Sequence, residues 1–128
     1  MRVHSVLDRL RGCGGKGVVV RRFGQVIGLD PECIEEYRRY HARIWPEIEE
    51  AIQQAGIRNY SIYLDREQLF AYFEYHGPDA EFDQRMAALA EAPRMREWWD
   101  IMEPMQRPLE DRAPDEWWKN LDEVFHQD

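Results

Sequence analysis

Two side chains that could exchange protons lie on one face of the segment from residue 31 to residue 55. Tyr37 and His41 are four residues apart, so their side chains can meet on a helix. Imidazole titrates near neutral pH, which suits a group that gives and takes protons. His41 is therefore a candidate acid/base group. The alternative is a core histidine that a hydrogen bond satisfies.

An apolar stripe surrounds these two groups and predicts that they point inward. Its members recur at steps of three and four residues, which is the spacing of one helix face: Ile34, Tyr37, His41, Ile44, Ile48, Ile52 and Ala55. The opposite face is charged or polar and is expected in solvent: Glu35, Arg38, Arg39, Glu49 and Gln53.

Two tryptophan pairs are the next candidates. Neighbouring residues on a helix point about 100° apart, so Trp98 and Trp99 cannot both enter the core. Either one of them packs in the core and the other lies in a subunit interface, or the pair forms an aromatic wall against the apolar face of a sugar. Trp117 and Trp118 lie beside a predicted loop and are interpreted as a packing anchor.

The sequence lacks the motifs of metal binding, nucleophilic catalysis and phosphate binding. The four histidines are scattered without the spacing of a metal site, and neither a serine nor a cysteine lies in a nucleophile elbow. The glycine-rich run at 12–17 lacks the Lys-Ser/Thr ending of a phosphate loop. We therefore expect neither a metal nor a cofactor.

Length, charge and cysteine content restrict the class of protein. The 128 residues suit one domain, and the net charge of −8 argues against nucleic acid or an anionic membrane as the main partner. There is no run of 18 apolar residues. Two cysteines without a scaffold spacing, and a first segment without a signal-peptide core, favour the cytoplasm.

The first residues differ from the rest of the chain. Six basic residues and one acidic residue lie within 1–22, and four glycines lie within 12–17. We expect a flexible basic extension over 1–17, followed by a single domain over 18–128.

The hydrophobic pattern predicts the order strand, helix, strand, strand, helix, strand. The first helix should be capped by Asp30 and broken near 43–45, ahead of Pro46. Gln25 shares a strand face with Phe23, so it either lines a cavity or is satisfied by a partner group. The predicted ranges are strand 18–29, helix 31–55, strands 57–65 and 69–75, a helix opened by 77–79 and interrupted at Pro93, a helix over 94–102, a loop over 104–115 and a strand over 121–126.

Strand 57–65 shows a regular alternation. It places Ile57, Asn59, Ser61 and Tyr63 on one face, and Arg58, Tyr60, Ile62 and Leu64 on the other.

This order of elements predicts an α+β fold of the ferredoxin-like βαββαβ type, with an antiparallel sheet and helices on one face. The other face of the sheet must be covered by a ligand, the C-terminal loop or a second subunit. The aromatic-rich strands favour a homodimer in which two sheets pack face to face.

Four motifs in order resemble the L-rhamnose mutarotase family. The run EYRRYHARIWPE at 36–47 is similar to its EYxxxHxxxWPE helix, and NYSIYL at 59–64 is similar to its NYxIYL strand. The Trp98–Trp99 pair, followed by Met102, and the ending Glu-Val-Phe at 123–125 complete the series. The resemblance covers about residues 20–126.

The resemblance implies a cofactor-independent epimerase that interconverts the α and β anomers of L-rhamnose, built as a dimeric α+β barrel. It implies that His41 is the proton donor and that Tyr37, Tyr60, Trp98 and Trp99 bind the monosaccharide. The basic extension and the Trp117–Trp118 pair depart from the family pattern, and the second departure leaves the preferred sugar open.

Two other functions remain open at this stage. One is a small cofactor-free monooxygenase or isomerase on the same fold, because a stripe of tyrosine and tryptophan also suits a flat aromatic substrate. The other is a non-catalytic, sugar-binding dimeric module.

Overall fold

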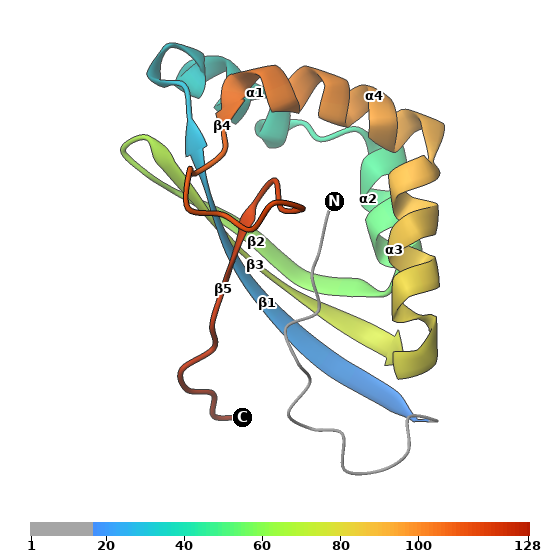
Figure 1. Ribbon diagram of the computed structural model, residues 1–128. Helices are drawn as coiled ribbons and strands as arrows, with labels where there is room; N and C mark the ends of the chain where they lie inside the picture. Colours follow the sequence, from blue (N-terminus) through green and yellow to red (C-terminus); the bar gives the residue numbers. More distant parts are fainter. Residues whose placement is uncertain (1–16) are drawn as a thin grey trace.

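The computed structural model describes residues 17–128, which form a curled antiparallel sheet with four α-helices on one side of it (Figure 1). The predicted extension over 1–17 lies outside the described residues except for Gly17. The elements are β1 (Val18–Leu29), α1 (Ile34–Ala42), α2 (Pro46–Gln54), β2 (Ile57–Asp65), β3 (Gln68–Pro78), α3 (Phe82–Glu91), α4 (Pro93–Met102), β4 (Gln106–Arg107) and β5 (Lys119–Leu121), with short 3-10 turns at Pro31–Cys33, Asp79–Glu81 and Glu103–Met105.

Strand β1 is the centre of the sheet. It pairs antiparallel with β3 over 11 residue pairs, from Val18 opposite Pro78 to Gly28 opposite Gln68. Its other edge pairs with β5 and β4, and β3 pairs with β2 beyond it. The α+β class predicted from the sequence is therefore confirmed.

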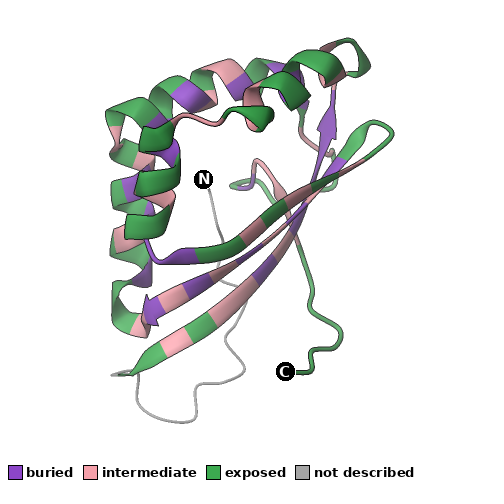
Figure 2. Cartoon of the chain, turned by 180° about the vertical axis from the view of Figure 1, so that it is seen from behind, coloured by how far each residue is buried: buried purple, intermediate pink, exposed green. Residues whose placement is uncertain are grey.

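The core lies between the sheet and the helices, where Figure 2 shows the buried residues of both layers. Alternate residues of β1 and β3 point toward the helices, so Phe23 stacks on Phe73 with ring centroids 4.8 Å apart. Phe82, at the start of α3, stacks on the other side of Phe23 at 5.5 Å. These contacts fix α3 against the centre of the sheet.

The predicted break in the first helix is confirmed. Helix α1 ends at Ala42 and α2 begins at Pro46, with Trp45 in extended conformation between them. Proline has no N–H to donate and disfavours helical geometry in the residue before it. His41 consequently lies in the last turn of α1.

The predicted alternation of strand 57–65 is wrong at its beginning. Ile57 is 3% exposed and lies on the same side as Tyr60 and Ile62, because the pairing with β3 shifts between Arg58 and Ser61. Asn59 adopts a positive φ of 52° within this bulge. One extra residue in the strand therefore brings Ile57 and Tyr60 to the helix side together.

The predicted last strand is also wrong. Strand β5 covers Lys119–Leu121, and residues 122–128 are exposed and form no regular element. The polar residue Asn120 holds β5 in place, because it pairs with Gln25 in the register and accepts a hydrogen bond of 2.9 Å from the Gln25 amide. Gln25 is 1% exposed and bonded to Asn120, so of its two predicted alternatives the second, satisfaction by a partner group, is confirmed.

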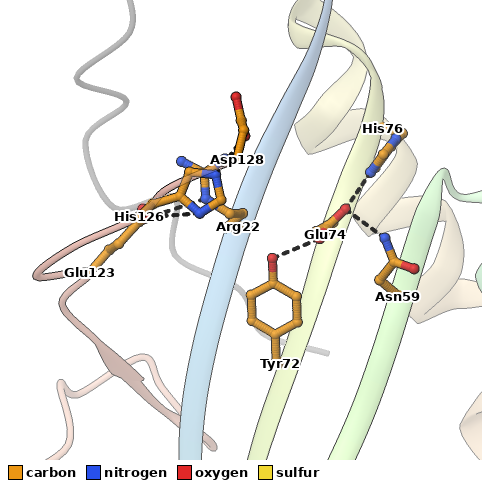
Figure 3. A network of polar contacts seen from close by, with 8 residues as sticks. All are labelled: Arg22, Asn59, Tyr72, Glu74, His76, Glu123, His126 and Asp128. Atoms are coloured by element: carbon orange, nitrogen blue, oxygen red, sulfur yellow. Dashed lines mark hydrogen bonds and ion pairs between the residues drawn. The ribbon is translucent and has the colours of Figure 1, made fainter.

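The face of the sheet turned away from the helices, here called the outer face, carries Val18, Val20, Arg22, Tyr63, Tyr72, Glu74, His76 and Leu121. Glu74 lies at the centre of a polar network on this face (Figure 3). It accepts hydrogen bonds from His76 at 2.6 Å, Tyr72 at 2.7 Å and Asn59 at 2.9 Å, and those from His76 and Tyr72 lower the pKa of Glu74 to about 2.

Among the described residues, no helix is both long and apolar enough to cross a membrane.

Gly56 offers a test of the turn between α2 and β2. Its φ is +86°, and a Cβ there would lie 2.8 Å from the backbone oxygen of His76. We expect Gly56→Ala to lower the free energy of unfolding by about 1–3 kcal/mol, measured by urea denaturation.

Gly24→Ala is the matched control, since a Cβ there meets nothing within 4 Å. It should change stability by less than about 0.5 kcal/mol. Equal losses in the two variants would contradict the assignment of strain to Gly56.

Candidate active site

A pocket of about 920 Å³ opens between the sheet and helices α1, α2 and α4. Its volume falls in the range of small-molecule sites. All five site residues predicted from the sequence line it: Tyr37, His41, Tyr60, Trp98 and Trp99. They come from α1, β2 and α4, so the tertiary structure brings together residues up to 62 positions apart in the chain.

His41 is oriented by the backbone of its own helix. Its Nδ1 lies 2.8 Å from the carbonyl oxygen of Tyr37, one turn earlier. A carbonyl only accepts, so Nδ1 carries a hydrogen and donates it. The neutral ring then has its lone pair on Nε2, which leaves Nε2 as the nitrogen that can take up or release a proton.

Burial lowers the pKa of His41 below its ordinary value of 6.5, although the hydrogen bond to the Tyr37 carbonyl acts in the opposite direction. The imidazole is therefore mainly neutral at pH 7. The same ring can become an imidazolium once a proton is supplied from within the pocket.

Aromatic rings hold His41 on two sides. The Tyr37 ring stacks against it with centroids 4.3 Å apart, and the Trp98 ring meets it edge-on at 5.4 Å. Trp98 is itself held by Trp45 at 5.2 Å and by Tyr40 at 5.9 Å, both in edge geometry. Trp98 is 5% exposed, so it combines a core position with a place in the pocket wall.

Trp99 differs from Trp98, as the 100° step along the helix requires. It is only partly buried and lines the same pocket. The two indoles therefore present an apolar surface of the kind that stacks on the C–H face of a sugar ring.

Tyr37 and Tyr60, two of the three tyrosines that line the pocket, are held in the neutral, protonated form. Burial raises the pKa of Tyr37 to about 12. Burial and the nearby Tyr37 raise the pKa of Tyr60 as well. Each phenol is thus a hydrogen-bond donor at neutral pH and a poor base.

Several pocket residues escaped the sequence analysis. Arg38, Glu49 and Gln53 were expected in solvent; they are exposed, yet they also line the pocket. Arg58 and Asn59, from the bulged part of β2, join them. The helical periodicity placed Arg38, Glu49 and Gln53 on the face opposite the apolar stripe, so the sequence carried no signal that they reach the pocket.

Gln106 was missed altogether. Its amide nitrogen donates to the hydroxyl of Tyr37 at 3.1 Å, and its amide oxygen accepts from Trp117 Nε1 at 2.8 Å. A single glutamine in a proline-containing segment carries no pattern in the sequence. Trp117, predicted as a packing anchor, does pack against the core, and in addition it makes this polar contact.

Within residues 17–128, no three histidine, cysteine or acidic side chains gather where they could hold a metal ion. In the same part of the chain, every deeply buried side-chain nitrogen or oxygen has a hydrogen-bond partner.

Comparisons with known proteins agree on one family. The family model described as L-rhamnose mutarotase matches residues 22–127. A protein named L-rhamnose mutarotase from Lactiplantibacillus plantarum is 40% identical over 110 residues, covering 84% of this chain and 98% of its own. One of the same name from Ligilactobacillus salivarius is 37% identical over 112 residues, covering 84% and 97%.

A solved structure gives the same result. The crystal structure of an L-rhamnose mutarotase from Formosa agariphila matches with a TM-score of 0.65 and 25% identity. The match covers 84% of this chain and 99% of that one.

The state of His41 can be measured directly. We expect ¹H–¹⁵N NMR of ¹⁵N-histidine-labelled protein to show His41 as the Nδ1–H tautomer, with a pKa below 6.5 because burial disfavours the charged ring. His41→Asn assigns the signal by its loss. A pKa above 6.5, or a neutral ring protonated on Nε2, would contradict the geometry.

Proposed function

The chain belongs to the L-rhamnose mutarotase family, and from this we propose that its pocket interconverts the α and β anomers of L-rhamnose. The observation that carries the proposal is His41, whose Nδ1 is tied to the Tyr37 carbonyl and whose Nε2 is left to exchange a proton inside the pocket.

The reaction needs two proton transfers and no net change of atoms. The hydroxyl on C1 loses its proton, the bond between C1 and the ring oxygen breaks, and the ring oxygen gains a proton. The open-chain aldehyde turns about its C1–C2 bond and closes on the other face by the reverse steps. One group that first accepts and then donates a proton suffices for each direction.

We assign this group to His41. Its neutral Nε2 accepts the anomeric proton, and the resulting imidazolium donates it to the ring oxygen. The lowered pKa of His41 supports both steps, because the ring begins neutral at pH 7 and becomes a more strongly acidic donor once it is charged.

The remaining pocket residues are assigned to binding. The neutral hydroxyls of Tyr37 and Tyr60 donate hydrogen bonds to sugar oxygens, which is supported by their raised pKa values. Trp98 and Trp99 cover an apolar face of the sugar. None of these assignments requires a cofactor.

We further propose that residues 18–128 are a single domain and that two copies form a ferredoxin-like dimeric α+β barrel through their outer faces. Exposed apolar side chains on that face support the pairing, with Val18 at 76%, Tyr63 at 66%, Val20 at 40% and Leu121 at 39% exposure. The two-cysteine composition supports a cytoplasmic location, and residues 1–17 are proposed to be a dispensable basic extension.

Saturation-transfer NMR on L-rhamnose tests the function. The protein should accelerate exchange between the anomeric signals, and His41→Asn should reduce kcat by at least about a hundredfold, because general acid–base catalysis contributes factors of this size. In the unsubstituted protein, kcat/KM should fall as the pH drops through the His41 pKa, where the accepting nitrogen becomes protonated.

His126→Asn is the control, since the His126 ring lies beside Glu123 and Asp128 and does not line the pocket. It should exchange the anomers at the rate of the unsubstituted protein. Full activity in His41→Asn would move the acid/base role to another residue. No acceleration by the unsubstituted protein would favour a binding module or, with oxygen uptake on an aromatic substrate, a monooxygenase.

Sedimentation velocity tests the homodimer. The protein should sediment as twice its chain mass of 15.4 kDa, and the double variant Val20→Glu/Leu121→Glu should sediment as a monomer, because four like charges would be desolvated in the interface.

Ala88→Glu, an added charge on an exposed position of α3, should leave the dimer intact. Dissociation by this control, or a dimer that survives the double variant, would place the interface elsewhere.

A further inference from the structure

The hydroxyl of Tyr37 is held from behind by a chain of two hydrogen bonds. Trp117 Nε1 donates to the amide oxygen of Gln106 at 2.8 Å, and the amide nitrogen of Gln106 donates to the Tyr37 hydroxyl oxygen at 3.1 Å. Gln106 is 9% exposed and Tyr37 is 4% exposed. Neither Gln106 nor Trp117 lines the pocket, so both act behind its wall.

The chemistry of the three groups determines the direction of both bonds. An indole N–H can only donate, so the amide oxygen must be the atom that faces Trp117. The amide nitrogen then faces Tyr37, and it also can only donate. The Tyr37 oxygen therefore accepts, and its single hydrogen is directed away from Gln106.

Gln106 and Trp117 are both fixed by the fold. Gln106 belongs to β4 and pairs with Leu29, the last residue of β1. Trp117 follows a turn organised by Glu116, which is 8% exposed and whose carboxylate accepts from Ala113 N at 2.9 Å and from the Asn120 amide at 2.7 Å. Arg112 closes the same turn by donating to the Glu116 carbonyl at 2.8 Å.

We propose that Gln106 and Trp117 are positioning residues that direct the Tyr37 hydroxyl hydrogen into the pocket, where it is donated to an oxygen of the sugar. Without the indole N–H, the Gln106 amide can turn its oxygen toward Tyr37. The hydroxyl would then donate to Gln106, and its hydrogen would be lost to the substrate. This inference rests on the proposed binding role of Tyr37.

In this proposal Trp117 orients the Gln106 amide in addition to packing against the core. The proposal also predicts a difference between the two indoles, because Trp118 packs against the core and no hydrogen bond from its indole is found among the described residues.

Two substitutions of Gln106 distinguish orientation of the Tyr37 hydroxyl hydrogen from a purely structural role. Gln106→Glu keeps the shape but, when ionised, accepts from both neighbours and takes the hydrogen of Tyr37. Gln106→Met removes both bonds and leaves that hydrogen free. We expect kcat for anomer exchange to fall about tenfold in Gln106→Glu and about threefold in Gln106→Met, since one substrate hydrogen bond contributes on this scale.

A merely structural role predicts the other order, because Gln106→Met loses more bonds than Gln106→Glu. Thermal unfolding of each variant is measured alongside, so that exchange is compared at temperatures where every variant is folded. A Gln106→Glu variant as active as the unsubstituted protein, or more active than Gln106→Met, overturns the proposal.

A double-mutant cycle tests whether Gln106 acts through Tyr37. Tyr37→Phe should lower kcat about tenfold, and adding Gln106→Glu to it should lower kcat no further. Additive losses would show that Gln106 acts by another route and would overturn the inference. Full activity in Tyr37→Phe would remove the role of Tyr37 and the inference with it, while the mutarotase activity would stand.

Trp117→Phe and Trp118→Phe form the matched pair, since both keep an aromatic ring and lose an indole N–H. Trp117→Phe should slow exchange about threefold, and Trp118→Phe should not change it. Equal rates in the two variants overturn the role of Trp117. Absence of exchange in the unsubstituted protein would instead contradict the proposed function itself.

Discussion

The arrangement of the pocket depends on the break between α1 and α2. Because Pro46 lacks a backbone donor and disfavours helical geometry before it, the first helix ends at Ala42 and the chain turns through an extended Trp45. The break lets Trp45 pack on Trp98, and Trp98 in turn packs on His41. The backbone geometry at Pro46 therefore affects the position of His41 through two ring contacts, Trp45 with Trp98 and Trp98 with His41.

Burial shifts the pKa values of His41, Tyr37 and Tyr60 in a consistent way. Desolvation disfavours whichever form carries a charge, so it lowers the pKa of His41 and raises those of Tyr37 and Tyr60. At neutral pH His41 is then a neutral proton acceptor, and Tyr37 and Tyr60 are neutral donors. This combination suits a substrate whose oxygens are uncharged and whose reaction needs a proton moved between two of them.

The two faces of the sheet serve different purposes because side chains alternate along each strand. The helix side of β1 and β3 is aromatic and buried, and it supports the pocket. The outer face combines the Glu74 network (Figure 3) with exposed apolar side chains, and this mixture fits the proposed dimer interface. The C-terminal segment connects the two sides, since β5 borders the sheet while Trp117 reaches the back of Tyr37 through Gln106.

The sequence by itself determined the order of the elements as far as α4, the helix break at Pro46 and the inward direction of Tyr37 and His41, because periodicity and proline geometry act over a few neighbouring residues. It did not determine β4, which lies in the predicted loop 104–115, or the bounds of β5. It could not determine the bulge that brings Ile57 and Tyr60 to one face, because the one-residue shift in the pairing of β2 with β3 has no recognisable residue pattern. Nor could it reveal Gln106 behind Tyr37, or Asn120 beside Gln25. Those pairs are 69 and 95 residues apart, and only the folded chain brings a buried amide to its partner.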